Sequence, residues 1–295
     1  MSEWHIGVIG GSGLYEPGAL EEAQEIPVES AFGEPSGPVV QGRLGKVRFT
    51  FLPRHGAGHA LSPSHVNYRA NIDVMKRCGV TDLVAISAIG SLQEARAPGD
   101  FVVVDQIIDR THLRTRSFFG DGIVAHVPLA DPVCRRLSQH AGRAVQATGA
   151  NVHKGGTYVA IEGPQFSTRA ESHMYREWGA DVIGMTAMPE ARLAREAELP
   201  YALVGMVTDY DCWRDAKEDV DVGAILQVMR ANADVARRTL VELARGLPAT
   251  REANPIDTVL DTAIVTPPDH WDPGALARLD AVAGRLLRNM PGRDN

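Results

Sequence analysis

The chain has 295 residues, a length that allows two domains but that α/β folds often use for one. Hydrophobic residues make up 44% of the chain, charged residues 23% and aromatic residues 6%, which excludes a collagenous, low-complexity or disordered protein. The formal net charge of −7 gives no diffuse attraction for nucleic acid or for an anionic membrane. An anion would therefore have to be bound by local donors.

The cysteines and the N-terminal segment favour a protein of the reducing cytosol. Cys78, Cys134 and Cys212 are too few and too scattered for a disulfide framework, and no CxxC pair indicates a zinc or redox site. The first twenty residues contain no basic region, and glycines interrupt their apolar run. This segment predicts neither a signal peptide nor a membrane span.

Short apolar segments typical of buried strands alternate with helical patterns along the chain. Strands are expected over residues 5–9, 47–52, 80–86, 101–108, 157–161, 181–185 and 201–207. Helices are expected over residues 68–77, 131–148, 168–178, 189–197 and 220–246. The alternation predicts an α/β fold with a mainly parallel or mixed sheet.

The end of the chain differs from the rest in its composition. No repeat or long linker precedes Gly246, so residues 1–247 are interpreted as one domain. Residues 248–257 are typical of a connector, and residues 275–288 of a short amphipathic helix. We expect the segment 248–295 to pack on its own domain or against a neighbouring subunit.

A glycine-rich turn follows the first expected strand. Gly10, Gly11 and Gly13 would let backbone amides converge on an anion, and Ser12 would add a hydroxyl donor. The turn lacks the GxGxxG pattern of dinucleotide sites, the GK[ST] of a Walker loop and the GxSxG of a nucleophile elbow. An ordinary tight turn is the alternative.

Arg54 and His55 follow the second expected strand. The guanidinium offers a planar fork for a phosphate, and the imidazole can donate a further hydrogen bond. A zinc site made by His55, His59 and His65 is less favoured, because glycines make this segment a loop and no acidic residue lies between the first two histidines. An ordinary surface loop also stays open.

Further polar and aromatic residues stand at the ends of later strands, where ligands of open α/β sheets gather. Ser87 and its neighbours end one strand, and Thr186 ends another, so both hydroxyls are expected at the same edge of the sheet. Phe166 could stack on a flat ligand or belong to the core. Thr168 or the preceding serine can cap the next helix, with Glu171 at the spacing of a capping box.

Asp209 and Asp211 come directly after the last buried strand. Their spacing would project both carboxyls in similar directions, and burial of one beside the other would raise a pKa toward neutrality. A helix N-cap and a metal-binding DxD are the alternatives. A hydroxyl-rich anion cradle facing a protonated acid suits chemistry in which phosphate attacks one side of a bond while the leaving group is protonated on the other.

These motifs lie within longer segments that resemble the trimeric purine nucleoside phosphorylase family, and within it the methylthioadenosine-cleaving branch. The segments are IGVIGGSGL, PRHGAGHALSPSHVNYRANI, SAIGSL, PGDFVVVDQIIDRT, IEGPQFSTRAES, WGADVIGMTAMPEARLAREAELPYA and VTDYDCW, in order over about residues 6–241. The resemblance implies a single α/β domain with a central, partly barrel-like mixed sheet flanked by helices. It also implies a homotrimer without metal or organic cofactor, in which inorganic phosphate is a co-substrate.

The resemblance also implies a reaction and a set of site residues. The reaction would convert 5'-methylthioadenosine and phosphate to adenine and 5-methylthioribose-1-phosphate. Phosphate would be held by Ser12, Arg54, His55, Ser87, Ala88 and Thr186. The nucleoside would contact Phe166 and Asp211 at the purine, Met185 at the ribose, Val222 and Ile225 around the 5'-group, and Asp209 as general acid at purine N7.

Asp209 and Ser167 bear on which purine base the protein would bind. The 6-oxopurine enzymes of the family have Asn in place of Asp209 and Glu in place of Ser167, so this chain favours adenine. Apolar Val222 and Ile225 suit a methylthio group and would leave a hydroxyl unpaired. Gly184, however, resembles the 6-oxopurine branch, so a 6-oxopurine or 5'-methylthioinosine phosphorylase is the alternative. A phosphate-independent nucleosidase and a non-catalytic nucleoside-binding protein are further hypotheses.

Overall fold

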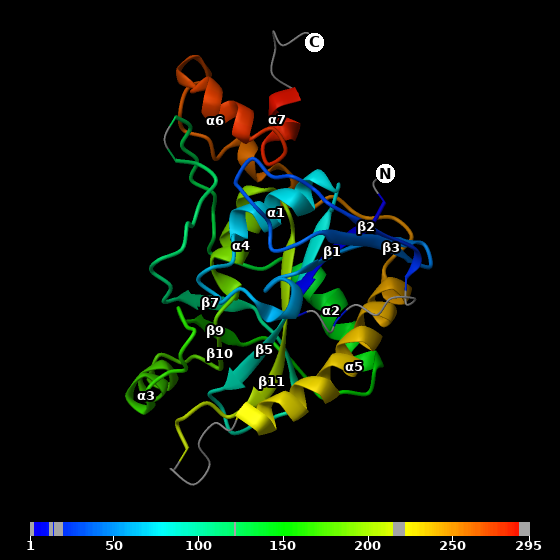
Figure 1. Cartoon of the computed structure of the whole chain (residues 1–295), viewed down its shortest axis with the longest axis vertical. Coiled ribbons are helices and arrows are strands. Elements are labelled where there is room, and N and C mark those ends of the chain that lie inside the picture. The colour runs from blue at the N-terminus through cyan, green and yellow to red at the C-terminus, as the bar shows by residue number, and fades with distance from the viewer. Residues whose placement is uncertain (1–2, 12–13, 15–19, 121, 215–221, 289–295) are drawn as a thin grey trace.

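The computed structural model describes residues 3–11, 14, 20–120, 122–214 and 222–288, and the strands found there form one mixed sheet with helices on both faces (Figure 1). The strands are β1 (His5–Gly10), β2 (Glu21–Ile26), β3 (Val39–Leu44), β4 (Val47–Pro53), β5 (Asp82–Ser91), β6 (Phe101–Val103), β7 (Gln106–Asp109), β8 (Val152–Lys154), β9 (Thr157–Ala160), β10 (Val182–Gly184) and β11 (Tyr201–Asp209). The helices are α1 (Tyr68–Arg77), α2 (Arg135–Ala147), α3 (Arg169–Glu177), α4 (Ala187–Glu196), α5 (Val222–Gly246), α6 (Pro273–Arg278) and α7 (Gly284–Arg288), with short 3-10 helices η1 (Ala57–His59), η3 (Pro255–Asp261) and η4 (Pro268–His270). The predicted α/β fold with a central mixed sheet is confirmed.

The strand β5 organises the sheet. It pairs in parallel with β1 in its first half and with β11 along its other edge, and β1 pairs in parallel with β4. At Gly90 and Ser91 the partner on the first edge becomes β10, which runs antiparallel. This change of partner along one strand bends the sheet, and the parallel strands β1, β4, β5 and β11 all end at the same edge.

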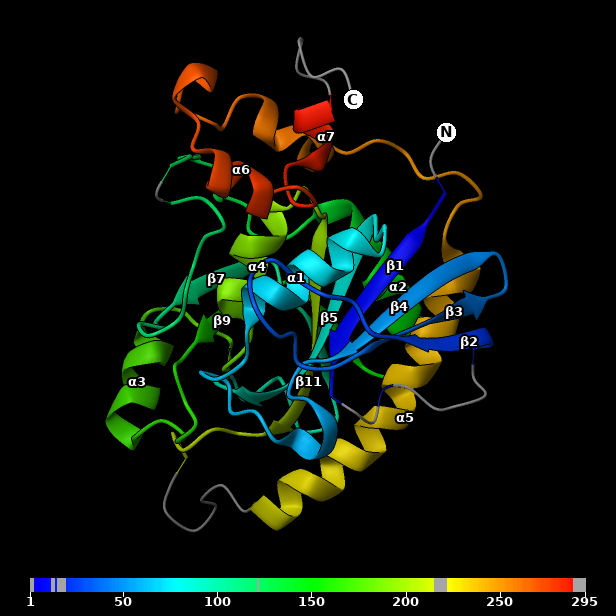
Figure 2. The ribbon, with the colours of Figure 1, turned by 45° about the horizontal axis from the view of Figure 1, so that its top comes forward.

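Two hydrophobic layers cover the two faces of the sheet (Figure 2). One layer contains Ile72 and Met75 of α1 together with Leu193 of α4. The other contains Leu137 of α2 and Leu240 of α5. Burial on both faces explains why β1, β5 and β11 are continuous apolar runs rather than alternating ones.

Three predicted elements are wrong in their extent, and three strands were not predicted. The strand expected over residues 80–86 continues to Ser91 as β5, so Ser87 lies within the strand rather than after its end. The single strand expected over residues 101–108 is divided, because β6 pairs with β11 and β8 whereas β7 pairs with β9. The helix expected over residues 275–288 is divided into α6 and α7. The missed strands are β2, β3 and β8; β2 is almost wholly exposed and polar, so it has no apolar signal.

The described part of the C-terminal segment packs on the same chain, beside α1 and α4 (Figure 1). Leu260, Leu279 and Val282 belong to the same apolar cluster as α1. Ion pairs tie the segment down, including Arg285 with Glu198 at 2.6 Å. Among the described helices, none is long and apolar enough to cross a membrane.

Candidate active site

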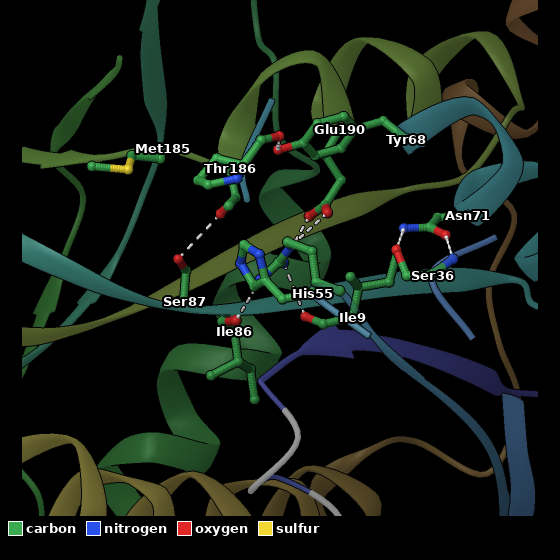
Figure 3. A network of polar contacts seen from close by, with 12 residues as sticks. Ile9, Ser36, His55, Tyr68, Asn71, Ile86, Ser87, Met185, Thr186 and Glu190 are labelled. Carbon is green, nitrogen blue, oxygen red and sulfur yellow. Dashed lines mark hydrogen bonds and ion pairs between the residues drawn. The ribbon is translucent and has the colours of Figure 1, made fainter. Parts of the chain in front are cut away.

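Two hydroxyls meet at the edge where the parallel strands end. Ser87 lies in β5 and Thr186 follows β10, yet their hydroxyl oxygens are 3.2 Å apart (Figure 3). Both side chains are buried, and the Ser87 hydroxyl also donates to the Ala88 carbonyl at 3.1 Å. The structure therefore brings together three of the predicted phosphate ligands. Ser12, a fourth, lies outside the described residues.

Arg54 lies directly after β4 and is 2% exposed. Its Nε and Nη2 donate to the two carboxylate oxygens of Glu190 at 2.8 and 3.0 Å. Nη2 also donates to the Ile9 carbonyl, at 3.0 Å, and Nη1 donates to the Ile86 carbonyl at 3.1 Å. Burial by itself would lower the pKa of the guanidinium, but the charge and hydrogen bonds of Glu190 raise it above its ordinary value.

This environment differs from the expectation that the fork of Arg54 faces a phosphate. Glu190 occupies the fork, so among the described residues one hydrogen, on Nη1, is left without a protein acceptor. Arg54 can therefore offer an anion its charge and a single hydrogen bond.

His55 also differs from the expected donor. Its Nδ1 lies 2.9 Å from the Leu61 carbonyl, which only accepts, so Nδ1 carries a proton. Burial, together with the charge of Arg54, lowers the pKa of His55 to about 4. The ring is therefore neutral at neutral pH and presents Nε2 as an acceptor. The ring of His59 stacks on it at 4.2 Å between centroids.

Tyr158 explains the glycine at position 184. A methyl group on Gly184 would lie 2.1 Å from the Tyr158 hydroxyl oxygen, so any side chain there would collide with it. That hydroxyl accepts a hydrogen bond from the Thr186 amide at 3.3 Å. The phenol of β9 thus fills the space beside β10 and supports Thr186 at the same time.

Asp209 and Asp211 lie side by side next to Gly90. A methyl group on Gly90 would come within 3.1 Å of Asp209 Oδ1 and within 3.5 Å of Asp211 Cβ. Burial raises the pKa of Asp209 to about 6; the hydroxyl of Thr208, which donates to Oδ2 at 2.7 Å, opposes this rise, and the charge of Asp211 adds to it. Burial raises the pKa of Asp211 as well. The pair therefore holds a carboxyl that is partly protonated near neutral pH.

The remaining predicted nucleoside contacts are placed less completely. Phe166 is 53% exposed, which excludes the alternative that it belongs to the core. Met185 is half-buried and packs against Gly163. Val222 and Ile225 lie in the first turn of α5, and their side chains are outside the described part of the structure.

The predicted cap of α3 is confirmed, and the capped helix is bonded to the segment that follows Asp211. Thr168 and Glu171 form a capping box at the start of the helix. Arg169, the first residue of α3, donates through Nη1 to the carbonyls of Cys212 and Arg214. The helix therefore carries the segment that follows Asp211.

Sequence reasoning missed Arg114, which links several segments of the site. Its guanidinium pairs with Glu162 at 3.0 Å and donates to the carbonyls of Met185 and Met188 and to the Tyr68 hydroxyl. Burial alone would raise the pKa of Glu162, but hydrogen bonds from Ser64 and two backbone amides, together with Arg114, lower it to about 2. No sequence signal singles Arg114 out, because its partners are 46 to 74 residues away.

The described residues contain no group of three or more His, Cys, Asp or Glu side chains arranged to hold a metal ion. His65 instead bonds to Ser62, with Oγ and Nδ1 2.7 Å apart.

Comparisons with known proteins show the family of the chain. A family model described as the Phosphorylase superfamily matches residues 5–245. The S-methyl-5'-thioadenosine phosphorylase of Cereibacter sphaeroides is 56% identical over 285 residues, which cover 96% of this chain and 98% of that protein. A crystal structure of a methylthioadenosine phosphorylase from an antarctic soil metagenomic library is 45% identical with a TM-score of 0.90, covering 95% of this chain and 99% of that one. A variant adenosine/methylthioadenosine phosphorylase of Schistosoma mansoni, solved in complex with methylthioadenosine, is 38% identical with a TM-score of 0.77, covering 82% of this chain and 91% of that one.

The fold and the matching family model thus assign the chain to the phosphorylase superfamily. Identity over nearly the whole length narrows the assignment, and the chain belongs to the S-methyl-5'-thioadenosine phosphorylase family. The resemblance seen in the sequence segments is confirmed. It extends further than those segments indicated, because the match covers 96% of the chain and so reaches past residue 248.

Proposed function

We propose that this protein is a pentosyltransferase that cleaves 5'-methylthioadenosine by phosphorolysis, giving adenine and 5-methylthioribose-1-phosphate. The names of its relatives support the substrate. The observation that supports the chemistry is that two pairs of polar side chains lie along one strand, β5. The hydroxyls of Ser87 and Thr186 meet at Ser87, and the carboxyls of Asp209 and Asp211 lie next to Gly90. Three residues of a strand span roughly 10 Å, which leaves room for a pentose between a phosphate and a purine.

The reaction balances with these groups and no cofactor. The C1'–N9 bond breaks and its electron pair passes to the purine ring, while a protonated Asp209 donates its proton to N7. A phosphate oxygen then forms the new bond to C1', after stabilising the cationic character of the sugar. General acid assistance of this kind contributes about 10² to 10⁴ in rate.

The phosphate would rest on the hydroxyls of Ser87 and Thr186 and on the remaining hydrogen of Arg54. The neutral His55 would accept a hydrogen bond from a protonated phosphate oxygen, or take up a proton as the phosphate charge raises its pKa. Ser12 and Ala88 complete the proposed phosphate ligands. On the other side, Phe166 would stack on the purine and Met185 would face the ribose.

Selection of the base rests on Asp209 and Asp211. Protonated Asp209 serves N7, and its other oxygen accepts from a 6-amino group. Val222 and Ile225 are proposed to line an apolar site for the 5'-methylthio group. Burial of a hydroxyl there would be unfavourable because it would find no partner.

We also propose a homotrimer in the cytoplasm, with a nucleoside and phosphate as its ligands and no nucleic acid partner. Exposed apolar side chains, including Leu113 and Val265 among the described residues, are the kind of surface that subunits cover. The charge of −7 argues against a nucleic acid partner, and the three scattered cysteines favour the cytoplasm. Light scattering after gel filtration tests the assembly, and a monomer would contradict it.

The decisive experiment is a substrate panel with and without phosphate. We expect methylthioadenosine to be consumed fastest, and only when phosphate is present. Faster turnover of inosine or methylthioinosine would instead indicate a 6-oxopurine enzyme. Adenine release without phosphate would indicate a nucleosidase, and tight binding without turnover a nucleoside-binding protein.

A further inference from the structure

The ion pair between Arg54 and Glu190 lies beside the proposed phosphate site but has no place in the reaction described above. Glu190 is 1% exposed, and both of its oxygens are used. Oε2 accepts from Arg54 Nε at 2.8 Å. Oε1 accepts from Arg54 Nη2 and from the Tyr201 hydroxyl, each at 3.0 Å. The carboxylate is therefore held on two sides.

The pair connects the three chain segments that carry the phosphate donors. Arg54 donates to the Ile9 carbonyl, just before the glycine-rich turn, and to the Ile86 carbonyl, just before Ser87. Glu190 lies in the first turn of α4, whose N-cap is Thr186. Figure 3 shows these groups gathered around one point, with the hydroxyls of Ser87 and Thr186 beside it. A shift of the guanidinium would thus move all three segments.

The pair also sets the direction of the one available Arg54 hydrogen. Four of the five guanidinium hydrogens are bound by Glu190 and the two carbonyls, so the plane of the group cannot rotate without breaking several charge-assisted bonds. Preorganised donors are effective because no reorganisation is needed when the ligand arrives.

We propose that Glu190 is a positioning residue for phosphate: it orients Arg54 and, through it, the segments that carry Ser87 and Thr186. The proposal rests on the phosphorolysis proposed above. It predicts that loss of the carboxylate weakens phosphate binding and leaves nucleoside binding nearly unchanged. A purely structural role would lower stability and affect both ligands alike.

The chain offers a matched control, Glu198, two residues after the end of the same helix. Glu198 pairs with Arg285 through the same two nitrogens, Nε at 2.8 Å and Nη2 at 2.6 Å, and its side chain is also buried. This pair fastens α7 rather than the strand ends. Glu198→Gln therefore removes an equivalent carboxylate without touching the proposed site.

The test measures phosphate KM, nucleoside KM and thermal stability for Glu190→Gln, Tyr201→Phe and Glu198→Gln. We expect Glu190→Gln to raise phosphate KM about tenfold or more while nucleoside KM changes less than about threefold. Tyr201→Phe removes one bond to Glu190 and should raise phosphate KM about two- to threefold. Glu198→Gln should lower the melting temperature and leave both KM values unchanged.

Several results would overturn the proposal. An unchanged or lower phosphate KM in Glu190→Gln would show that the carboxylate does not support phosphate binding. An equal rise in nucleoside KM would indicate general damage. If Glu190→Gln fails to fold, Tyr201→Phe decides, and an unchanged phosphate KM there is sufficient to reject the role.

A calorimetric titration with inorganic phosphate separates this proposal from the reaction itself. If the wild-type protein binds phosphate but does not cleave methylthioadenosine, the proposed function fails while the effect of Glu190→Gln on phosphate affinity still tests the positioning role. Equal phosphate affinity in both proteins would reject the positioning role even if turnover is normal.

Discussion

The phosphate side and the base side of the site are built in opposite ways. On the proposed phosphate side, Arg54 and Thr186 are almost wholly buried. Arg54 is bonded to Glu190 and to two main-chain carbonyls, and Thr186 is bonded to Ser87 and to the Tyr158 hydroxyl. On the proposed base side, Phe166 is 53% exposed, and Asp209 is partly buried with a raised pKa. Among the described residues, the donors of the phosphate side are held in place before any ligand arrives, whereas the base side gains partners by binding one.

The difference follows from the two ligands. A phosphate is small and highly charged, so it is bound best by donors that are already fixed. A purine is flat and partly apolar, so it can cover the exposed ring of Phe166. It can also give the carboxyl of Asp209 a hydrogen-bond partner. Breaking one side should therefore leave the other side intact, and four predictions test this.

The largest effect is expected from Asp209→Asn. Removing the acid should lower kcat/KM for methylthioadenosine about 10²-fold or more and shift relative preference toward 6-oxopurines, because an amide can donate to O6. Steady-state kinetics on both nucleoside classes measure this, with Asp211→Asn as the matched control. Unchanged selectivity would reject the acid assignment.

Arg54→Met should break the phosphate side by stranding Glu190. An uncompensated buried carboxylate costs about 3 to 5 kcal/mol, so urea denaturation should show a loss of this size. Arg54→Met combined with Glu190→Leu should recover most of the stability, because no buried charge is left. A single variant as stable as the wild type would contradict the ion pair's proposed importance.

Substitution on the base side should raise the stability of the protein rather than lower it, because the ionised Asp209 destabilises the folded state. The pKa of Asp209 is raised from 3.8 in the unfolded chain to about 6 in the folded protein. The stability that depends on the protonated carboxyl is therefore fully present below pH 3.8, and it is lost as the pH rises through about 6. Asp209→Asn should therefore be more stable than the wild type by about 3 kcal/mol near pH 8, and equal to it near pH 3.5. Thermal unfolding across this range would show the gain, and a gain that does not depend on pH would contradict the raised pKa.

The smallest effect is expected at the cap of α3. Thr168→Ala removes the capping box and should cost about 1 kcal/mol. Because Arg169 of this helix holds the segment after Asp211, nucleoside KM should rise slightly while phosphate KM stays constant. Thr168→Ser keeps the hydroxyl and serves as the control; equal losses in both variants would argue against the cap.

Much of the fold was predictable because its central strands are buried on both faces. The run of β11 and the periodicity of α1 are local signals, and the predicted bounds of α1 agree with the structure. The exposed β2 gave no such signal, and the division into β6 and β7 depends on which partner each half meets. Pairing is a property of distant segments, so no local pattern records it.

The sequence by itself determined which residues stand at the strand ends, and therefore the family and the class of chemistry. Only the tertiary structure decided how those residues are used. It placed Glu190 in the fork of Arg54, 136 residues away, and bonded His55 Nδ1 to the Leu61 carbonyl, which leaves Nε2 as an acceptor. It also filled the space beside Gly184 with Tyr158. Such roles depend on burial and long-range hydrogen bonds, which exist only once the chain has folded.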